Sequence, residues 1–347
     1  MKELANVNDR PRSGYVIKRL AGAPQEGDKR FSPQTQWQTL FAVPLAVAVA
    51  LVIHWFAAKK EPPGETHLYT YFLSGLLVAA VLAAAVKPLR SGLREWMRTV
   101  CPLIAVAVLF LTGWELMTAG FRLLPLPYFP SPAGVLQSLV NDRAVLFDST
   151  WHSLILLLSG YALGVAVGLF SGICIGWFPQ ARYWGMPVLK FIGPIPATAW
   201  IPLAMVLSPS AMFSAVALIA LAVWFPVTML TASGLSNTRA SYLDVARTLG
   251  AGRAYLIFHV AIPGAMPSIF LGLFMGLGAS FLTLVVAETV GVKSGLGWYL
   301  SWAQGWAEYG KVYAALVIMA AFFSTIMTAL FMARDRVLGW QKGVIKW

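Results

Sequence analysis

Charged residues are scarce in this 347-residue sequence, in which Asp, Glu, Lys and Arg together make up 12%. A soluble domain carries roughly 25% charged residues, so the chain lacks the polar coat that a water-exposed surface requires. Hydrophobic residues account for 58% of the sequence, and the mean hydropathy is +0.70. This composition excludes an ordinary soluble protein and predicts that much of the surface faces lipid.

Cysteines and catalytic motifs are equally sparse. The two cysteines, Cys101 and Cys174, lie at or in apolar segments, which excludes a disulfide framework and favours reduced, packed thiols. No G-x-x-x-x-G-K-[ST] phosphate loop occurs, and the nearest pattern, at 22–29, has an aspartate where the motif has its lysine. The four histidines are scattered. We therefore expect no catalytic residue, no metal site, no bound cofactor and no ATP hydrolysis by this chain.

Eight apolar segments are candidates for membrane-spanning helices, each of which needs about 20 residues. They are approximately 39–58, 68–86, 100–120, 152–177, 191–207, 211–234, 265–289 and 312–333. The fifth segment is the weakest, because Pro194, Pro196 and Pro202 interrupt it and each proline removes a backbone donor. Irregular backbone at membrane depth is tolerated only where it is buried in protein or lines a wet cavity. These prolines are therefore candidate pathway or structural residues.

Basic residues indicate the orientation, because Lys and Arg accumulate in cytoplasmic loops. With the N-terminus inside, 20 of the 26 basic residues fall in cytoplasmic segments and 6 outside. We therefore expect an all-α integral membrane protein with both termini cytoplasmic. Residues 1–98 would form a cytoplasmic tail and two additional spans, and 99–347 a six-span part. Topology and contact with anionic lipid explain the formal charge of +12, so nucleic-acid binding is not needed to explain it.

Glycines recur at every fourth position of the fourth apolar segment. They are Gly160, Gly164, Gly168, Gly172 and Gly176. Such a ridge lets another helix approach closely, and packing of this kind drives helix association in lipid. We interpret the ridge as a packing surface; the alternative is a sliding surface for a moving gate.

Two carboxylates, Glu115 and Glu288, lie within apolar segments. A buried charge in the bilayer is costly, so each needs protein, water or a partner group. Glu115 lies near the predicted outer end of its helix. Its carboxylate could reach water at the membrane interface there, and we do not prefer this role over another. For Glu288 two interpretations stand, a structural hydrogen-bond anchor, which we favour, or a site for proton or ion coupling.

The inner loop 235–264 has the signals of two short helices at the membrane surface. Ser241 followed by Asp244 is a plausible capping box. Gly250 offers a C-terminal cap for the first helix, and a second helix would end before Pro263. Short surface helices need tertiary contacts for stability, so either this protein or a partner is expected to pack on them.

This loop resembles the EAA loop of binding-protein-dependent importer permeases, whose pattern is E-A-A, three residues, Gly, nine residues and I-x-L-P. The matching residues here are Asp244-Val245-Ala246, Gly250 and Val260-Ala261-Ile262-Pro263. The spacing is intact, and the four replacements are conservative. In the family this loop is the coupling helix, which docks on the ATPase subunit. The resemblance thus implies that Asp244, Ala246, Gly250 and Pro263 belong to the coupling surface.

Shorter stretches resemble the branch of that family which imports nitrate, sulfonates, taurine and bicarbonate. They are Trp114-Glu115-Leu116, Phe129-Pro130-Ser131-Pro132, Pro194-Ile195-Pro196, Trp200-Ile201-Pro202, Ala246-Arg247-Thr248-Leu249-Gly250-Ala251, Val286-Ala287-Glu288 and Gly295-Leu296-Gly297. The likeness extends over about 99–347 and implies a six-helix ABC importer permease core in the bacterial cytoplasmic (inner) membrane. By the same resemblance, the transported solute would be small and anionic.

The resemblance also implies partners. ATP and Mg would bind to a separate ABC ATPase subunit, and a periplasmic or extracellular substrate-binding protein would deliver the solute. A second permease chain, identical or paralogous, would complete the pathway. The alternative from another class is an ion-gradient-driven secondary transporter, which usually shows inverted repeats with broken helices in both halves. Only one proline-broken segment is found, without a counterpart. A membrane enzyme would need converging catalytic groups that the two carboxylates alone do not supply.

Overall fold

The computed structural model describes residues 33–57, 66–86, 91–124 and 126–341. Every regular element in these ranges is helical, and the all-α class is confirmed. The tail that we expect in the cytoplasm, the loop between the first two apolar segments and the last six residues lie outside the described residues. The predicted location of both termini therefore stays a prediction.

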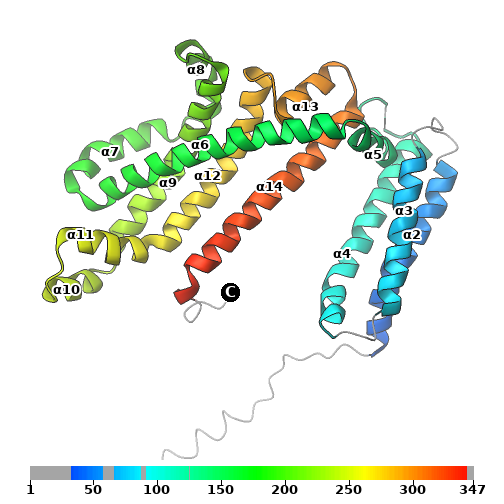
Figure 1. The fold of residues 1–347 in the computed structure, drawn as a ribbon, viewed down its shortest axis with the longest axis horizontal. Coiled ribbons are helices and arrows are strands. Elements are labelled where there is room, and N and C mark those ends of the chain that lie inside the picture. Colours follow the sequence, from blue (N-terminus) through cyan, green and yellow to red (C-terminus); the bar gives the residue numbers. More distant parts are fainter. Residues whose placement is uncertain (1–32, 58–65, 87–90, 125, 342–347) are drawn as a thin grey trace, which may run out of the picture. The chain divides into compact units, whose positions relative to one another are not determined.

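The elements follow one another as helices joined by short connections (Figure 1). In chain order they are α2 (Pro33–Ala57), α3 (Thr66–Val86), α4 (Ser91–Glu115), the π-turn η3 (Leu116–Gly120), α5 (Pro132–Asn141), α6 (Arg143–Trp177), α7 (Pro179–Ile192), the 3-10 turn η4 (Ala197–Trp200), α8 (Ile201–Leu207), α9 (Ala211–Ser236), α10 (Ala240–Thr248), α11 (Arg253–Tyr255), the π-turn η5 (Leu256–Ala261), α12 (Ile262–Val290), α13 (Leu296–Gly305), α14 (Tyr309–Val337) and the 3-10 turn η6 (Gly339–Gln341).

Five helical stretches are long and apolar enough to cross a membrane, and a sixth is obtained if one bent pair is counted as a single span. They are Val100–Gly120, Arg143–Trp177, Ala211–Ser236, Arg253–Val290, Tyr309–Val337 and the pair Pro179–Ile192 with Ala197–Leu207. These six contain or overlap the last six predicted segments. The first two predicted spans correspond to α2 and α3, whose described apolar stretches, Ala42–Ala57 and His67–Ala83, are shorter. The count of eight spans therefore stays a prediction.

The chain divides into two compact units. One contains Met1–Val52 and Leu73–Phe110, and the other contains Ile53–Phe72 and Leu111–Trp347. The division that we predict after residue 98 separates the two additional spans from the permease core. It stays a prediction.

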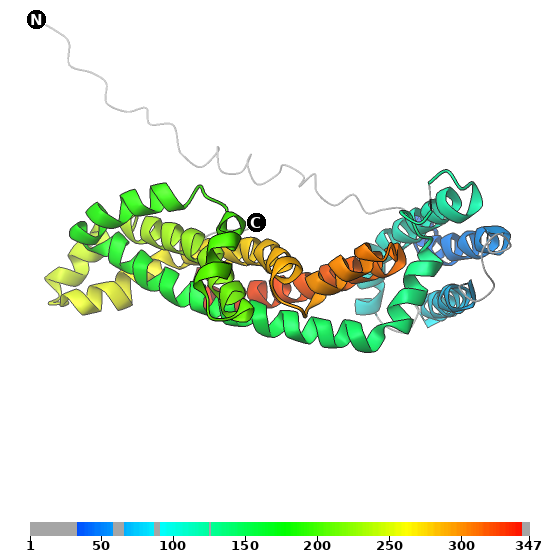
Figure 2. The same ribbon diagram turned by 90° about the horizontal axis from the view of Figure 1, so that it is seen from above.

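Within the second unit, α9 lies between α6 and α12, and the three helices run side by side in both views (Figures 1 and 2). The five glycines of α6 face α9. A Cβ atom added at any of them would come within 2.6 to 2.9 Å of an α9 atom. Gly272 and Gly276 of α12 meet the same helix, with corresponding distances of 3.2 and 3.1 Å. Close backbone approach, which only small residues permit, therefore sets the spacing of this layer.

The α7 helix begins before the fifth predicted segment, and its first turn carries Pro179, a position where proline costs no hydrogen bond. One local expectation from the sequence is wrong. The second short helix of the inner loop does not end before Pro263. It continues through η5 into α12 as one stretch, Arg253–Val290, because Pro263 lies in the first turn of α12, where its missing N–H is tolerated.

The α6–α9 contact makes a direct prediction for Gly164→Ala. The new Cβ would lie 2.6 Å from the Ala220 carbonyl oxygen and 2.7 Å from Val223 Cβ, so backbone atoms must move. We expect a loss of about 1–3 kcal/mol, the usual cost of overpacking a close-packed interior, measured as unfolding of the detergent-solubilised protein. The matched control is Gly278→Ala in α12, where a Cβ meets nothing within 4 Å and helix propensity gains roughly 0.8–1.0 kcal/mol. Equal stability of the two variants would contradict this packing.

Candidate functional site

The helix α10 and the turn that follows it form an exposed apolar groove on the inner loop. None of the α10 residues is buried, and Val245 and Leu249 are 60% and 82% exposed. The groove has a volume of about 580 Å³. Its lining residues are Tyr242, Val245, Ala246, Leu249, Gly250, Ala251, Gly252, Tyr255, His259 and Val260. The rings of Tyr255 and His259 stack with centroids 4.4 Å apart and form one wall.

Gly250 ends α10 in a left-handed conformation, with φ +85°. The Ala251 N–H donates to the Ala246 carbonyl (3.0 Å) and the Gly250 N–H donates to the Arg247 carbonyl (2.9 Å). This pair of bonds is a Schellman motif, which satisfies carbonyls that a helix end leaves without partners. A Cβ at Gly250 would meet nothing within 4 Å. The sequence therefore needs glycine here for its backbone angle and not for space, as the predicted C-terminal cap requires.

The predicted N-terminal capping box is wrong. The N-cap of α10 is Arg239, which makes no side-chain cap. Asp244 instead accepts a hydrogen bond from Arg247 Nη1 (2.9 Å), one helical turn further along the exposed face. Of the four residues predicted for coupling, Ala246 and Gly250 line the groove. Asp244 stands on the same helix outside the lining, and Pro263 lies at the start of α12.

The proline-broken segment borders a second cavity, of about 350 Å³. The α7 helix ends at Ile192, and the following helical segment is bent away from it by 84°. Lining residues come from this break, from α9 and from α12. They are Ile192, Gly193, Ile195, Pro196, Ala197, Thr198, Leu221, Ala222, Phe225, Pro226, Met275, Ala279, Leu282 and Thr283. Pro196 is thus at the cavity, and Pro194 and Pro202 are not in its lining. No ionisable side chain lines it among the residues that the structure describes.

Glu288 is buried, with 1% of its surface exposed, and its carboxylate is held by two donors. Ser153 Oγ on α6 donates to Oε1 (2.6 Å), and the Gly297 N–H at the start of α13 donates to Oε2 (2.7 Å). The Leu296 N–H in turn donates to Ser153 Oγ (2.9 Å). The carboxylate therefore joins α6, α12 and the N-terminus of α13, a favourable place for a negative charge. These contacts favour the structural anchor over an ion-coupling site.

Gly295 makes room for this carboxylate. Its φ is +101°, and a Cβ would lie 2.2 Å from Glu288 Oε1. The turn before α13 therefore needs glycine both for its backbone angle and for space. The sequence contains Glu288 and the G-L-G stretch, but spacing alone does not indicate that the turn wraps around the carboxylate.

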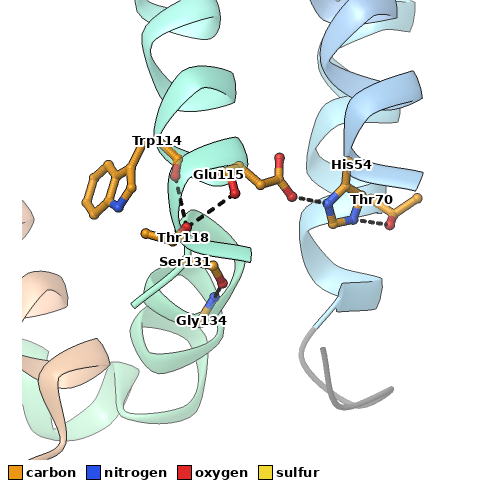
Figure 3. A network of polar contacts seen from close by, with 7 residues as sticks. All are labelled: His54, Thr70, Trp114, Glu115, Thr118, Ser131 and Gly134. Carbon is orange, nitrogen blue, oxygen red and sulfur yellow. Dashed lines mark hydrogen bonds and ion pairs between the residues drawn. The ribbon is translucent and has the colours of Figure 1, made fainter. Parts of the chain in front are cut away.

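Two further polar contacts were not predicted from the sequence. The hydroxyl of Tyr299 on α13 donates to Asp142 Oδ2 (2.7 Å), and Lys311 Nζ lies 3.4 Å from the same oxygen. Burial and the Asp142 carboxylate raise the pKa of the Tyr299 phenol. The second contact joins three helices: His54 of α2 bonds the Glu115 carboxylate at the end of α4 and Thr70 of α3 (Figure 3). Glu115 is therefore paired inside the protein, which the sequence left open.

Comparison with known proteins agrees with these features. A sequence model of the family described as binding-protein-dependent transport system inner membrane component matches 164–338. A probable ABC transporter permease protein of Haemophilus influenzae is 31% identical over 65% of this chain and 91% of its own length. The taurine transport system permease protein TauC of Escherichia coli is 28% identical (68% and 87%), and the bicarbonate transport system permease protein CmpB of Synechocystis is 28% identical (70% and 88%).

Among the solved structures that match is a crystal form of the MetNI methionine ABC transporter, with a TM-score of 0.49, 16% identity and coverage of 57% of this chain and 98% of that chain. The apolar helices and the broken span define a multi-pass membrane protein. The sequence match places it more narrowly: the chain belongs to the family of binding-protein-dependent transport system inner membrane components. It is an ABC transporter permease, a transport subunit and not an enzyme.

The Glu288 network makes a prediction for two substitutions. Glu288→Ala leaves the Ser153 hydroxyl and the Gly297 N–H without their acceptor, and each buried unpaired group costs about 1–3 kcal/mol. We expect a loss of about 2–6 kcal/mol in unfolding of the solubilised protein. Glu288→Gln keeps the shape and one acceptor oxygen, so it should lose clearly less.

Gly295→Ala gives an independent check of the same anchor. Its methyl group would overlap the carboxylate, so its stability loss should shrink when Glu288→Ala is already present. Additive losses in the double variant would show that the two residues do not meet.

Proposed function

We propose that this chain forms the translocation pathway of an importer and is driven by a separate ATPase that docks in the inner groove. The groove supports the docking, since it is a concave apolar surface on a loop that we place in the cytoplasm. Exposed contiguous apolar surface of this kind marks a site for a partner. A nine-residue helix with no buried residue also needs tertiary contacts for stability, and a partner seated in the groove would supply them.

The proposed pathway lies at the broken span. The cavity beside the break is lined by apolar residues together with Thr198 and Thr283, so a solute there meets no fixed charge from the described residues. Non-helical backbone at membrane depth is tolerated where it lines a cavity. A second permease chain, identical or paralogous, would complete the pathway around this surface.

The proposed solute is a small anion of the sulfonate, taurine, nitrate or bicarbonate class. Support comes from relatives, among them TauC, CmpB and a putative aliphatic sulfonates transport permease protein of Bacillus subtilis that is 28% identical over 71% of this chain. We propose that a soluble binding protein delivers the solute at the outer face and that the complex resides in the bacterial inner membrane. ATP and Mg would bind to the ATPase alone.

The docking proposal is tested by Leu249→Glu. The side chain is 82% exposed, so the substitution places a charge in the groove without disturbing the fold. We expect a tagged wild-type chain to recover an ATPase from gently solubilised membranes of its own cells, and Leu249→Glu to lose most of it. The control is Trp340→Glu, another exposed apolar residue (61%) on the side that we predict to be cytoplasmic. No ATPase with wild type, in several mild detergents, would contradict the proposal and direct attention to gradient-driven transport.

The turn itself gives a second prediction. Gly250→Ala forces a side chain into a left-handed conformation, which costs roughly 1–2 kcal/mol, and should misplace the end of α10. Gly252→Ala adds the same methyl group two residues later, where φ is negative and a Cβ also meets nothing within 4 Å. We expect recovery of the ATPase to fall in the first variant only. Equal recovery from both would mean that the Schellman turn does not shape the docking surface.

The solute class is tested by uptake into proteoliposomes containing the purified complex and its binding protein. ATP-dependent uptake of labelled taurine, an alkanesulfonate, nitrate or bicarbonate is expected for one of the four. Uptake of none of them, by a complex whose ATPase is active, would overturn the solute class and leave the docking proposal standing.

A further inference from the structure

The C-terminal end of α2 and the N-terminal end of α3, which belong to the second compact unit, meet the end of α4 in a buried polar network (Figure 3). His54 of α2 and Glu115 of α4 are 2% and 1% exposed. His54 Nδ1 bonds Glu115 Oε1, and His54 Nε2 lies 2.9 Å from the hydroxyl of Thr70 on α3. One imidazole therefore joins three helices. The family match at 164–338 does not include any of them.

His54 is the partner that the Glu115 carboxylate has in this network. An ionised carboxylate only accepts hydrogen bonds, so the Nδ1 atom that faces it carries the proton. Within the described residues, Glu115 Oε2 has no hydrogen-bond partner, which leaves His54 as the group that neutralises the charge. A buried charge in an apolar span is strongly unfavourable unless it is paired. Removal of the imidazole would therefore harm the fold far more than loss of one hydrogen bond.

Glu115 occupies a point where the chain changes its winding. It is the last residue of α4, and the π-turn η3 begins at Leu116. Thr118 in this turn donates its hydroxyl proton to the Trp114 carbonyl (2.9 Å) and is 4% exposed. A π-turn in a helix often marks a functional position.

The π-turn also forms a wall of a cavity of about 480 Å³. Thr118 and Ala119 line it on one side, and Tyr309 and Lys311 at the start of α14 line it on another. In the predicted topology this cavity opens on the outer face. A contact that fixes Glu115 therefore fixes the wall of the cavity.

We propose that the ends of α2 and α3 within the second unit are a built-in support of the permease core: His54, supported by Thr70, clamps Glu115 and thereby holds the π-turn Leu116–Gly120 as the wall of the outer cavity. His54 and Thr70 are positioning residues. The additional helices are thus part of the working structure and not an inert membrane anchor. The clamp can be tested in the full-length chain whether or not the proposed solute and partners are correct.

The test is a double-mutant cycle with leucine at both positions, read as thermal stability of the full-length protein in detergent. His54→Leu leaves a buried carboxylate without its partner and should give the largest fall in melting temperature. Glu115→Leu leaves a histidine that can be neutral, and should lose less. The double variant replaces the pair by apolar side chains, which commonly restores stability, so it should melt well above His54→Leu. A double variant as unstable as His54→Leu, or less stable, would overturn the clamp.

The chain offers a matched control in another histidine and acid. His152 Nδ1 and Asp148 Oδ2 lie 3.4 Å apart on α6, with side chains 48% and 71% exposed. Exposed pairs of this kind contribute little. The same leucine cycle there should show small losses and no recovery in the double variant. A recovery of equal size at both pairs would mean that hydrophobic substitution alone produces the effect.

To test whether His54 positions the π-turn, a measurement is needed that does not respond to general destabilisation of the protein. Ala119→Cys, in a Cys101→Ser/Cys174→Ser background, places a thiol in the buried wall of the outer cavity (Ala119 is 6% exposed). With the clamp intact, a membrane-impermeant maleimide should label it slowly. Labelling should become faster in His54→Leu and slow again in the His54→Leu/Glu115→Leu variant, both measured well below their melting temperatures. Labelling that does not change with His54→Leu would overturn the positioning role.

Discussion

Close contact of α9 with α6 on one side and α12 on the other is the constraint on which the rest of the core depends. In lipid, apolar surface gives no net drive for helices to meet, so association relies on van der Waals packing and interhelical hydrogen bonds. The α6 glycines bring the backbone of α9 close enough for this packing along five successive turns. Both cavities of the proposed mechanism are built on this layer: α9 and α12 line the one at the broken span, and the stretch that continues into α12 carries a wall of the inner groove.

The two carboxylates in the spans show two ways of holding a charge in an apolar layer. Glu288 is stabilised without a basic partner, by a hydroxyl and a backbone N–H at the start of a helix. Glu115 is stabilised by an imidazole from a helix 61 positions earlier in the sequence. Each carboxylate fixes the relative positions of the segments that it joins. Hydrogen bonds are directional, whereas apolar packing alone would allow the segments to shift along one another. A carboxylate inside a membrane span usually suggests ion coupling. For Glu115 and Glu288, the observed hydrogen bonds instead indicate a structural role.

Much of the fold could be predicted from the sequence, because its signals are local. Apolar length located the five long apolar helices and the bent pair, prolines located the break after Ile192, and Gly250 located the end of α10. The remainder depends on which segments meet. Glycine spacing predicts a packing ridge but does not identify α9 as the helix against it. No local pattern connects His54 with Glu115, or Glu288 with the turn at Gly295. The predicted boundary before Pro263 was wrong because this proline lies in the first turn of α12, where a helix accepts it.

The inner groove and the Glu288 anchor lie on one continuous helical stretch, Arg253–Val290. Tyr255 and His259 form a wall of the groove near its start, whereas Glu288, near its end, holds α6 and the beginning of α13. Gly272 and Gly276, between them, press on α9. A packed helix moves as a unit because protein interiors deform little. A tilt that a partner imposes at the groove must therefore be transmitted along the helix to Glu288 or absorbed at η5, the π-turn that contains His259 of the groove wall. For a permease driven from its inner face, the stiffness of this one helix therefore decides whether docking at α10 can alter the cavity beside the broken span.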